Sequence, residues 1–240
     1  MKTIYFDCAM GAAGDMLTAA LLELHPDPEG VLRRLNGLGL PGVEVSAVPS
    51  VKCGITGTHV LVKVHGEEEE SMDVSHDHDH GHDHGHDHDH DHGYEHDHAH
   101  EHSHSHGHHH AGMHEVEHII SHLPVSEKVR GDVLGVYRLI AEAESHAHGK
   151  PVEEIHFHEV GTLDAVADVT AVCLLLEELA PEQVVCSPIH VGSGQVRCAH
   201  GILPVPAPAT AHILREVPTY GGSVRGELCT PCLLYTSRCV

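Results

Sequence analysis

The chain has 240 residues, of which 40% are apolar, so it is long enough to bury the core of one large domain or two small ones. Of its 36 acidic residues, fourteen lie within residues 67–101, which hold no Lys or Arg. The remaining 22 stand against 13 basic residues, a balance that excludes the basic surface of a nucleic-acid-binding protein. No apolar run approaches the roughly 20 residues of a membrane span and no secretory signal is recognisable, so we expect a cytoplasmic protein without a membrane partner.

The eight cysteines are scattered without a repeated spacing, which fits reduced thiols better than a disulfide framework. One C-x-x-C pair, Cys229 and Cys232, is by itself a weak signal for a zinc or redox site. Aromatic residues are scarce and Trp is absent, so we expect a mostly aliphatic core.

The chain opens with a pattern typical of a strand, a tight turn and a helix. The strand covers Thr3–Asp7, the glycine turn Gly11–Asp15 and the apolar-periodic helix Met16–Leu24. The turn matches neither the Walker A loop nor G-x-G-x-x-G, and this argues against a nickel-delivering GTPase with a similar histidine run.

Four residues of this opening segment are candidates for function. Asp7 ends the strand, where the ligand crevice of open α/β sheets lies, and Asp15 is placed to cap the helix. The free amides at the helix start favour an anion site, to which Gly11 and Gly14 would contribute. We treat both carboxylates as catalytic candidates; the alternatives are a satisfied loop carboxylate and a purely structural cap.

A pair of β-rich runs follows, Val43–Pro49 and Thr56–His65, separated by the glycine-containing turn Val51–Gly54. We interpret them as antiparallel strands. Residues 67–113 then form an insert that we expect to be disordered, because it offers too few apolar side chains to offset the entropy of ordering.

Within the insert, residues 76–110 hold 18 of the chain's 31 histidines, alternating with Asp. Imidazole suits nickel, zinc and copper, and the carboxylates concentrate divalent cations, so we interpret this histidine tract as a metal collector. A solvated linker or an affinity tag is the alternative. We take as representative ligands His78, His80, His84, His88, His90, His92, His98, His104 and His108.

After the insert, His114, His118 and His122 fall on one face of a helix, where they either relay metal or form a solvated face.

Downstream elements follow in mixed order, which indicates an α/β or α+β domain with a mixed sheet and packed helices, formed by residues 1–66 and 114–231. Residues 232–240 match no domain pattern and read as a non-native tail. The predicted elements are a helix over Ser126–Ala147, a nearly all-apolar and therefore central helix over Thr162–Leu179, a strand over Gln183–Val191, a turn over Gly192–Gly194, an extended segment over Leu203–Pro208 and a helix over Ala209–Glu216.

The densest group of metal-binding residue types outside the tract lies between residues 156 and 168. His156 and His158 alternate in an extended segment, and Asp164 and Asp168 share one face of the helix that follows. With Glu159 they form a donor set for nickel, zinc, manganese or magnesium, and we expect His158, Glu159 and Asp164 to serve catalysis as well. The alternative is a core histidine with carboxylates that complement the helix dipole.

A second group surrounds a glycine turn. Gly192, Ser193 and Gly194 could cradle a phosphate, with Arg197 as its charged partner and His200 beside it. A soft-ligand role for His200, with Cys198, is the alternative, and glycine turns are too common for this pattern to decide between them.

Four segments in order carry a family resemblance: YFDCAMGAAGDM at residues 5–16, HFHEVGTLDAVADV at 156–169, VGSGQVRCAHGILPVPAPAT at 191–210 and GELCTP at 226–231. With the histidine-rich insert they closely resemble the LarC family, the nickel-insertion proteins of the lactate racemase system.

The resemblance implies a chelatase or cyclometallase that places Ni(II) into pyridinium-3,5-bisthiocarboxylic acid mononucleotide, with nickel–carbon and nickel–sulfur bonds formed at the expense of CTP. It further implies CTP with Mg or Mn bound in a C-terminal domain that this chain lacks, an apo lactate racemase or similar enzyme as recipient, and a homo-oligomer as a possible assembly. We therefore expect the tract to feed nickel to the folded histidine and carboxylate group, while the Gly192–His200 segment and the Gly11–Asp15 loop hold the mononucleotide. The rival hypothesis is a non-enzymatic nickel or zinc metallochaperone or store.

Overall fold

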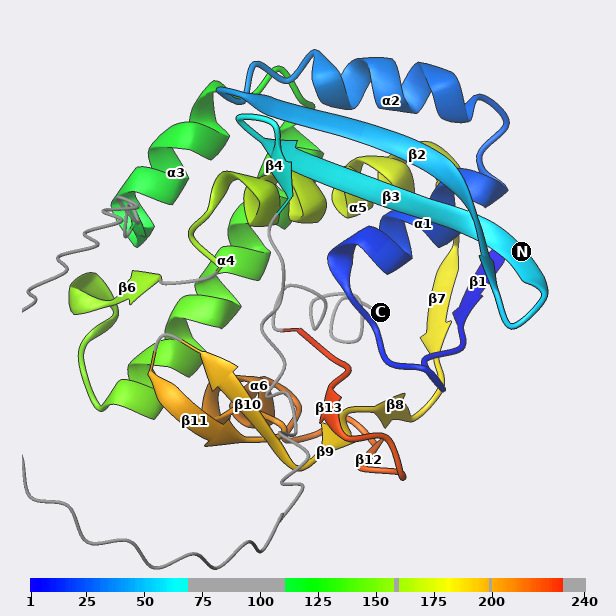
Figure 1. Ribbon diagram of the computed structural model, residues 1–240. Helices are drawn as coiled ribbons and strands as arrows, with labels where there is room; N and C mark the ends of the chain where they lie inside the picture. Colours follow the sequence, from blue (N-terminus) through cyan, green and yellow to red (C-terminus); the bar gives the residue numbers. More distant parts are fainter. Residues whose placement is uncertain (69–110, 158–159, 199, 231–240) are drawn as a thin grey trace, which may run out of the picture. The chain divides into compact units, whose positions relative to one another are not determined.

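The computed structural model describes residues 1–68, 111–157, 160–198 and 200–230 (Figure 1). All of them belong to one compact unit, Met1–Val74 with His109–Val240. The histidine tract, with its nine representative ligands from His78 to His108, lies outside the described residues, as do His158, Glu159 and the tail over residues 232–240. The predicted disorder of the insert therefore stays a prediction.

The described chain combines helices with strands of 2 to 10 residues. The elements in order are β1 (Thr3–Phe6), α1 (Gly14–Leu24), α2 (Pro28–Asn36), β2 (Val43–Lys52), β3 (Ile55–Val64), β4 (Glu67–Glu68), β5 (Ala111–Gly112), α3 (Met113–His122), α4 (Glu127–His148), the 3₁₀ helix η1 (Val152–Glu154), β6 (His156–Phe157), α5 (Leu163–Leu179), β7 (Gln183–Cys186), β8 (Ile189–His190), β9 (Gly192–Ser193), β10 (Gln195–Cys198), β11 (Gly201–Pro204), α6 (Pro208–Ile213), β12 (Thr219–Tyr220) and β13 (Gly226–Glu227).

Helix α5 is the centre of the core, as its apolar sequence predicts. It packs against α1, α2 and α4 and also contacts the β2–β3 hairpin (Figure 1). Val166 and Leu175 are fully buried on it. Other elements cover α5 on several sides, so apolar residues on one face alone could not fill all of its contacts. This central position explains why the helix is apolar all round. No helix in the part of the chain that the structure describes is long and apolar enough to cross a membrane.

Helix α4 confirms the predicted helix and both of its boundaries. The Ser126 hydroxyl accepts a hydrogen bond from the Val129 N–H at 3.0 Å and donates one to Glu177 at 2.6 Å. At the other end Gly149 adopts a left-handed conformation with φ 63°, which suits a residue without Cβ. Tyr137 on this helix is fully buried and packs edge-on against Phe157.

The predicted antiparallel pair is confirmed as the β2–β3 hairpin, which is longer than the apolar pattern suggested. Its register joins Val43 to Val64 and Lys52 to Ile55. The connecting residues, Cys53 and Gly54, both have positive φ, as a two-residue hairpin turn that matches the strand twist requires.

The strand pairing is mixed, as predicted, but it is divided among several small sheets. β1 pairs with β7 and β8 with β12 in parallel, whereas β9 pairs with β13, β10 with β11 and β5 with β6 in antiparallel fashion. The strands after α5 are only two to four residues long, so each pairs with one neighbour before the chain turns.

Several predicted boundaries are wrong in detail. The insert predicted over residues 67–113 includes paired backbone at both ends, because Glu67–Glu68 pairs with β3 and Ala111–Gly112 pairs with β6. The strand predicted over Gln183–Val191 is divided into β7 and β8, since Pro188 lies between them and has no N–H to donate. Helix α6 ends at Ile213 and not at Glu216.

The N-terminal cap of α4 gives the first testable prediction. Ser126→Ala removes both hydroxyl hydrogen bonds and should lower the free energy of unfolding by about 1 kcal/mol, measured by urea denaturation. Ser126→Thr keeps a capping hydroxyl and should retain most of the stability that Ser126→Ala loses. Equal losses in the two variants would mean that the hydroxyl does not act as a cap.

Candidate functional site

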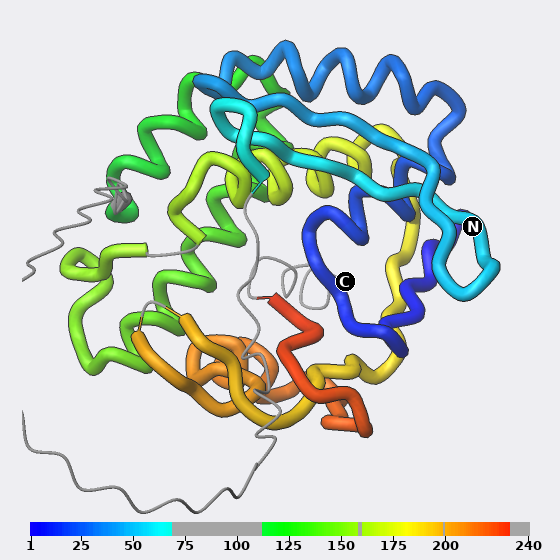
Figure 2. The backbone as a smooth tube through the Cα atoms, in the orientation of Figure 1, coloured from blue at the N-terminus to red at the C-terminus, as the bar shows by residue number. Residues whose placement is uncertain are grey.

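The four segments that carry the family resemblance meet around the start of α1. The Ala12 N–H donates to the Leu228 carbonyl at 2.7 Å, and the Thr230 N–H donates back to the Ala12 carbonyl at 3.3 Å. Figure 2 shows the red end of the described chain beside the blue loop that follows β1. Residues far apart in the sequence thus share one backbone ladder.

We call this meeting of the four segments the junction, and two glycines make it possible. Gly11 has φ +86°, and a Cβ on it would overlap the carbonyl oxygen of Leu228. Gly192 has φ +84°, and a Cβ there would overlap the carbonyl oxygen of Gly226. Both positions combine a left-handed backbone with direct backbone contact, so a side chain is excluded for two reasons.

The predicted turn over Gly192–Gly194 is partly wrong. Gly192 and Ser193 form β9 against β13, and the Ser193 hydroxyl donates to the Val224 carbonyl at 2.8 Å. Gly194, with φ +92°, is exposed and has open space around it. The space that a phosphate cradle would need at Gly192 is therefore filled by the β13 backbone, and of the three residues only Gly194 lies beside open space.

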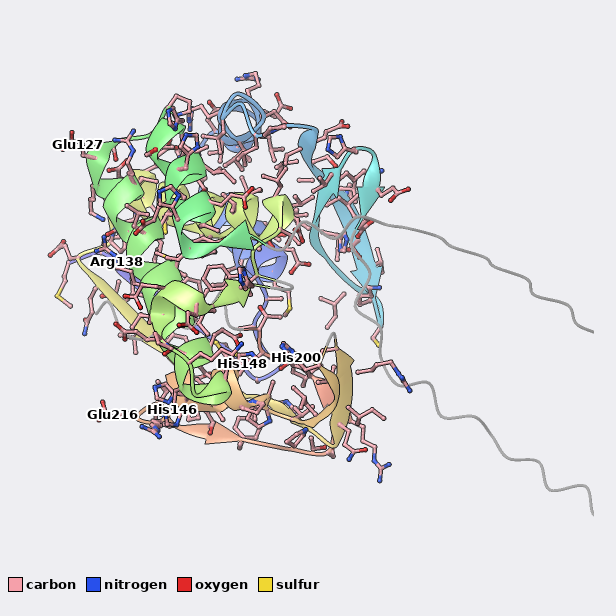
Figure 3. All side chains as sticks on the ribbon, turned by 90° about the vertical axis from the view of Figure 1, so that its left-hand side faces the viewer. Glu127, Arg138, His146, His148, His200 and Glu216 are labelled. Carbon is pink, nitrogen blue, oxygen red and sulfur yellow. The ribbon has the colours of Figure 1, made fainter. Side chains whose placement is uncertain are left out.

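Arg197 and His200 lie at the edge of the β10–β11 hairpin. Arg197 is exposed on β10, opposite Ile202 in the strand register. His200 is also exposed, and its ring lies 4.8 Å from that of His148 at the end of α4 (Figure 3). Their roles in binding a mononucleotide stay predictions.

His190 is a buried residue of this junction, to which the sequence assigned no role. Its Nδ1 lies 2.9 Å from the Ala9 carbonyl oxygen and its Nε2 3.1 Å from that of Gly221. The ring stacks on Tyr220 with centroids 4.7 Å apart. Because both ring nitrogens contact main-chain oxygens, His190 links the loop after β1 to the segment after β12.

The predicted cap role of Asp15 is wrong. Helix α1 begins at Gly14, its N-cap residue is Ala13 in an extended conformation, and no side chain caps it. Asp15 already has helical geometry in the first turn, so its carboxylate can complement the helix dipole but cannot precede the helix. Asp7 is exposed, and its Oδ1 accepts a hydrogen bond from the Ala9 N–H at 3.1 Å, which agrees with the local loop role given above as the alternative.

Asp15, Asp164 and Asp168 form an acidic group where α1 and α5 begin. Gly14 lets the two helix starts approach, since a Cβ on it would lie 2.5 Å from Oδ2 of Asp168. Burial, with added repulsion from Asp15 and then Asp164, raises the pKa of Asp168 from 3.8 to about 8. Oδ1 of Asp164 and Oδ1 of Asp168 are buried without a hydrogen-bond partner in the described residues. Asp168 therefore holds its proton at neutral pH.

The predicted metal group is only partly within the described residues. His156 is exposed on β6, with Phe157 buried beside it. Within residues 1–68, 111–157, 160–198 and 200–230, no three His, Cys, Asp or Glu side chains lie close enough together to hold a metal ion. His156, Asp164 and Asp168 thus do not form a three-ligand site by themselves, and the other two predicted ligands, His158 and Glu159, lie outside the described residues.

Three cysteine thiols also lie at this junction. The spacing of the cysteines in the sequence did not predict that they would come together. Cys8 Sγ is 3.6 Å from Cys186 Sγ, and Cys229 is fully buried on the segment that pairs with Ala12. Burial raises the pKa of Cys8 to about 12, with the hydrogen bond to Cys186 adding to it. Burial, followed by repulsion from Glu227, raises the pKa of Cys229 to about 12. Both thiols are therefore protonated at neutral pH when no metal is bound.

Comparison with known proteins bears on this junction. The sequence model of a family described as nickel insertion protein matches residues 4–234. The chain is 38% identical over 236 residues to the pyridinium-3,5-bisthiocarboxylic acid mononucleotide nickel insertion protein of Clostridium kluyveri, covering 96% of this chain and 51% of that protein. It is 40% identical over 235 residues to the protein of the same name from Clostridium acetobutylicum, covering 96% and 54%.

A putative nickel insertion protein of Dictyoglomus thermophilum is 35% identical over 236 residues, with 96% of this chain and 50% of that protein covered. The chain therefore spans about half the length of the curated relatives it matches. No solved structure matches it.

The Gly11 contact predicts a large loss of stability on a minimal substitution. Gly11→Ala adds a Cβ at positive φ against the Leu228 carbonyl and should lower the free energy of unfolding by at least about 2 kcal/mol. Gly131→Ala is the matched control, because Gly131 is exposed within α4 with nothing near its Cβ position, and it should stabilise the chain by up to about 1 kcal/mol. Similar results for the two variants in urea denaturation would contradict the contact.

The buried carboxyl of Asp168 predicts a pH-dependent stability. The folded pKa of Asp168, about 8, is above the ordinary value of 3.8. The contribution of this carboxyl group to the free energy of unfolding is therefore fully present below about pH 4 and is lost as the pH rises towards 8. Asp168→Asn does not titrate, so the wild-type stability should fall relative to the variant by up to about 1.4 kcal/mol per pH unit in this window. Urea denaturation from pH 4 to 9 measures the difference, and a difference independent of pH would refute the shift.

Proposed function

Because the chain belongs to the nickel insertion protein family, we propose that it is the metal-collecting and substrate-holding half of a protein that inserts nickel into pyridinium-3,5-bisthiocarboxylic acid mononucleotide. The family match over residues 4–234 supports this proposal. The structural observation that carries it is the meeting of segments 5–16, 156–169, 191–210 and 226–231 around the start of α1.

Nickel is a substrate in this proposal, and the histidine tract collects it. The 18 imidazoles of residues 76–110 are borderline ligands, and the carboxylates between them raise the local concentration of divalent cations. Tethering then presents the metal to the folded part at high effective concentration without requiring a tight individual site.

The acidic group supplies the proton chemistry. Exchange of a carbon–hydrogen bond of the pyridinium ring for a nickel–carbon bond releases one proton, which a nearby base must accept. Asp168 has a pKa of about 8, so the ionised fraction that can accept this proton grows as the pH rises from neutral towards 8. A base works best when its pKa lies near the working pH, which suits Asp168 to this role. Burial keeps that pKa high, and repulsion from Asp15 and then from Asp164 adds to it. His158 and Glu159, which precede α5 in the chain, are the metal-binding partners we assign to this site.

The exposed side of the junction would hold the mononucleotide. Arg197 provides a positive charge for its phosphate, and Gly194 has the open space around its backbone that a ligand needs. The chelatase activity, a lyase-class reaction, would depend on CTP with Mg or Mn bound in a further half like that of the longer relatives. An apo lactate racemase or a similar nickel-pincer enzyme would receive the product.

Mass spectrometry of the pincer precursor tests the proposal. The chain is combined with the C-terminal half of a longer relative, Ni(II), CTP and Mn(II), and conversion should depend on this chain. Asp168→Asn should reduce the initial rate at least tenfold and remove the dependence of the rate on pH near 8. Glu23→Gln, a substitution of an exposed carboxylate on the same helix as Asp15, is the matched control and should leave the rate unchanged.

Deletion of residues 76–110 separates the two roles of the chain. We expect it to slow conversion at limiting nickel and to have little effect at saturating nickel, because the tract supplies metal without taking part in the reaction. If the deletion abolishes conversion at every nickel concentration while Asp168→Asn has no effect, the chain is a metallochaperone or store and not part of the insertion site.

A further inference from the structure

Cys8 and Cys186 come from the ends of two neighbouring parallel strands. In the β1–β7 register Phe6 is opposite Cys186, and Cys8 follows β1 by two residues. The Cys8 N–H donates to the Ser187 hydroxyl at 2.9 Å, which holds the two strand ends together. The register therefore places the two sulfur atoms in contact, 3.6 Å apart.

The 3.6 Å separation is that of two free thiols in contact, and it is close to the sulfur–sulfur distance of a metal chelate. A disulfide requires about 2.05 Å between the sulfur atoms, and both cysteines are free. Two thiolates that bind one tetrahedral cation with metal–sulfur bonds of about 2.3 Å lie about 3.8 Å apart. A shift of a few tenths of an ångström would turn this thiol contact into a chelating pair.

The surroundings hold Cys8 in place and leave one approach open. The Cys8 carbonyl oxygen accepts hydrogen bonds from the Gly11 N–H at 3.0 Å and from the His190 N–H at 3.1 Å. Cys8 is only 4% exposed, whereas Cys186 is partly accessible. A cation could thus enter from the Cys186 side and meet a sulfur atom whose backbone is already fixed.

We propose that Cys8 and Cys186 form a two-thiolate transit site through which the nickel substrate passes between the histidine tract and the organic ligand. The proposal rests on the proposed function and adds a site to it. On binding, each thiol gives its proton to solvent and two metal–sulfur bonds form, with no change in oxidation state. Thiolates are softer ligands than imidazoles, so they can withdraw a borderline cation from the tract.

A site with only two protein ligands is suited to transfer rather than storage. In the described residues no three metal-binding side chains lie close enough together to hold one ion, so at this pair the other coordination positions are left for water or for an incoming ligand. The thiocarboxylate sulfur atoms of the mononucleotide are donors of the same soft class and could complete the coordination before they remove the metal. Cys8 is suitably placed for this, because it directly precedes the loop that carries Gly11 and leads into α1.

Cadmium titration of the full chain under reducing conditions tests the site. Thiolate-to-cadmium charge transfer absorbs in the ultraviolet, and the imidazoles of the tract do not produce this band. We expect a band that saturates near one cadmium per chain and is lost in Cys8→Ala and in Cys186→Ala. Cys53→Ala, exposed in the β2–β3 turn, and Cys173→Ala, buried in α5, are matched controls that should keep it.

Three outcomes would overturn the proposal: a band that survives in the Cys8→Ala/Cys186→Ala double variant, a band that depends on Cys229 and Cys232 in place of this pair, or no band at all.

Alkylation mapping of the unchanged chain covers the case of a variant that does not fold. There cadmium should protect Cys186 from iodoacetamide and leave Cys53 reactive, and equal reactivity with and without cadmium would overturn the proposal. A band without conversion of the pincer precursor would count against the proposed function alone, because cadmium binding is measured without CTP or precursor.

Discussion

The junction of this protein depends on close contacts between main-chain atoms at two glycines, where no side chain keeps the segments apart. Gly11 lies against Leu228 and Gly192 against Gly226, both with positive φ. These contacts draw the loop after β1, the strand β9 and the segment from β13 into one place. A Cβ at either glycine would push the segments apart, so the positions of the acidic group and the thiol pair both rely on this close packing.

Close packing also sets the chemistry of the charged and nucleophilic groups. Asp168 is buried against Gly14 near two other carboxylates, so its neutral form is favoured. Cys8 lies in a similarly desolvated position beside Cys186. In the proposed function the chain combines two kinds of ligand. The 18 imidazoles of the tract would gather ions through number and charge, and a few buried groups of fixed geometry would select and react.

Local signals in the sequence predicted the regular elements well. Ser126 and Gly149 mark the two ends of α4, and the all-apolar run of α5 predicts its central place. Sequence reasoning failed where the outcome depends on distant residues. Asp15 has the right residue type for a cap, but the helix already begins at Gly14, which packs on Asp168 of α5. The predicted phosphate cradle fails at Gly192 for a similar reason, since the contact with Gly226 fills it.

The sequence by itself indicated the histidine tract, the family resemblance, the hairpin and the helices other than α2 (Pro28–Asn36), because composition, capping residues and apolar periodicity act over a few neighbouring positions. Only the tertiary structure decided which side chains meet. Cys8 and Cys186 are 178 positions apart, and no spacing pattern connects them; the register of the β1–β7 parallel pair does. The raised pKa of Asp168 likewise follows from burial between two helix starts, a desolvation that a periodic pattern cannot reveal.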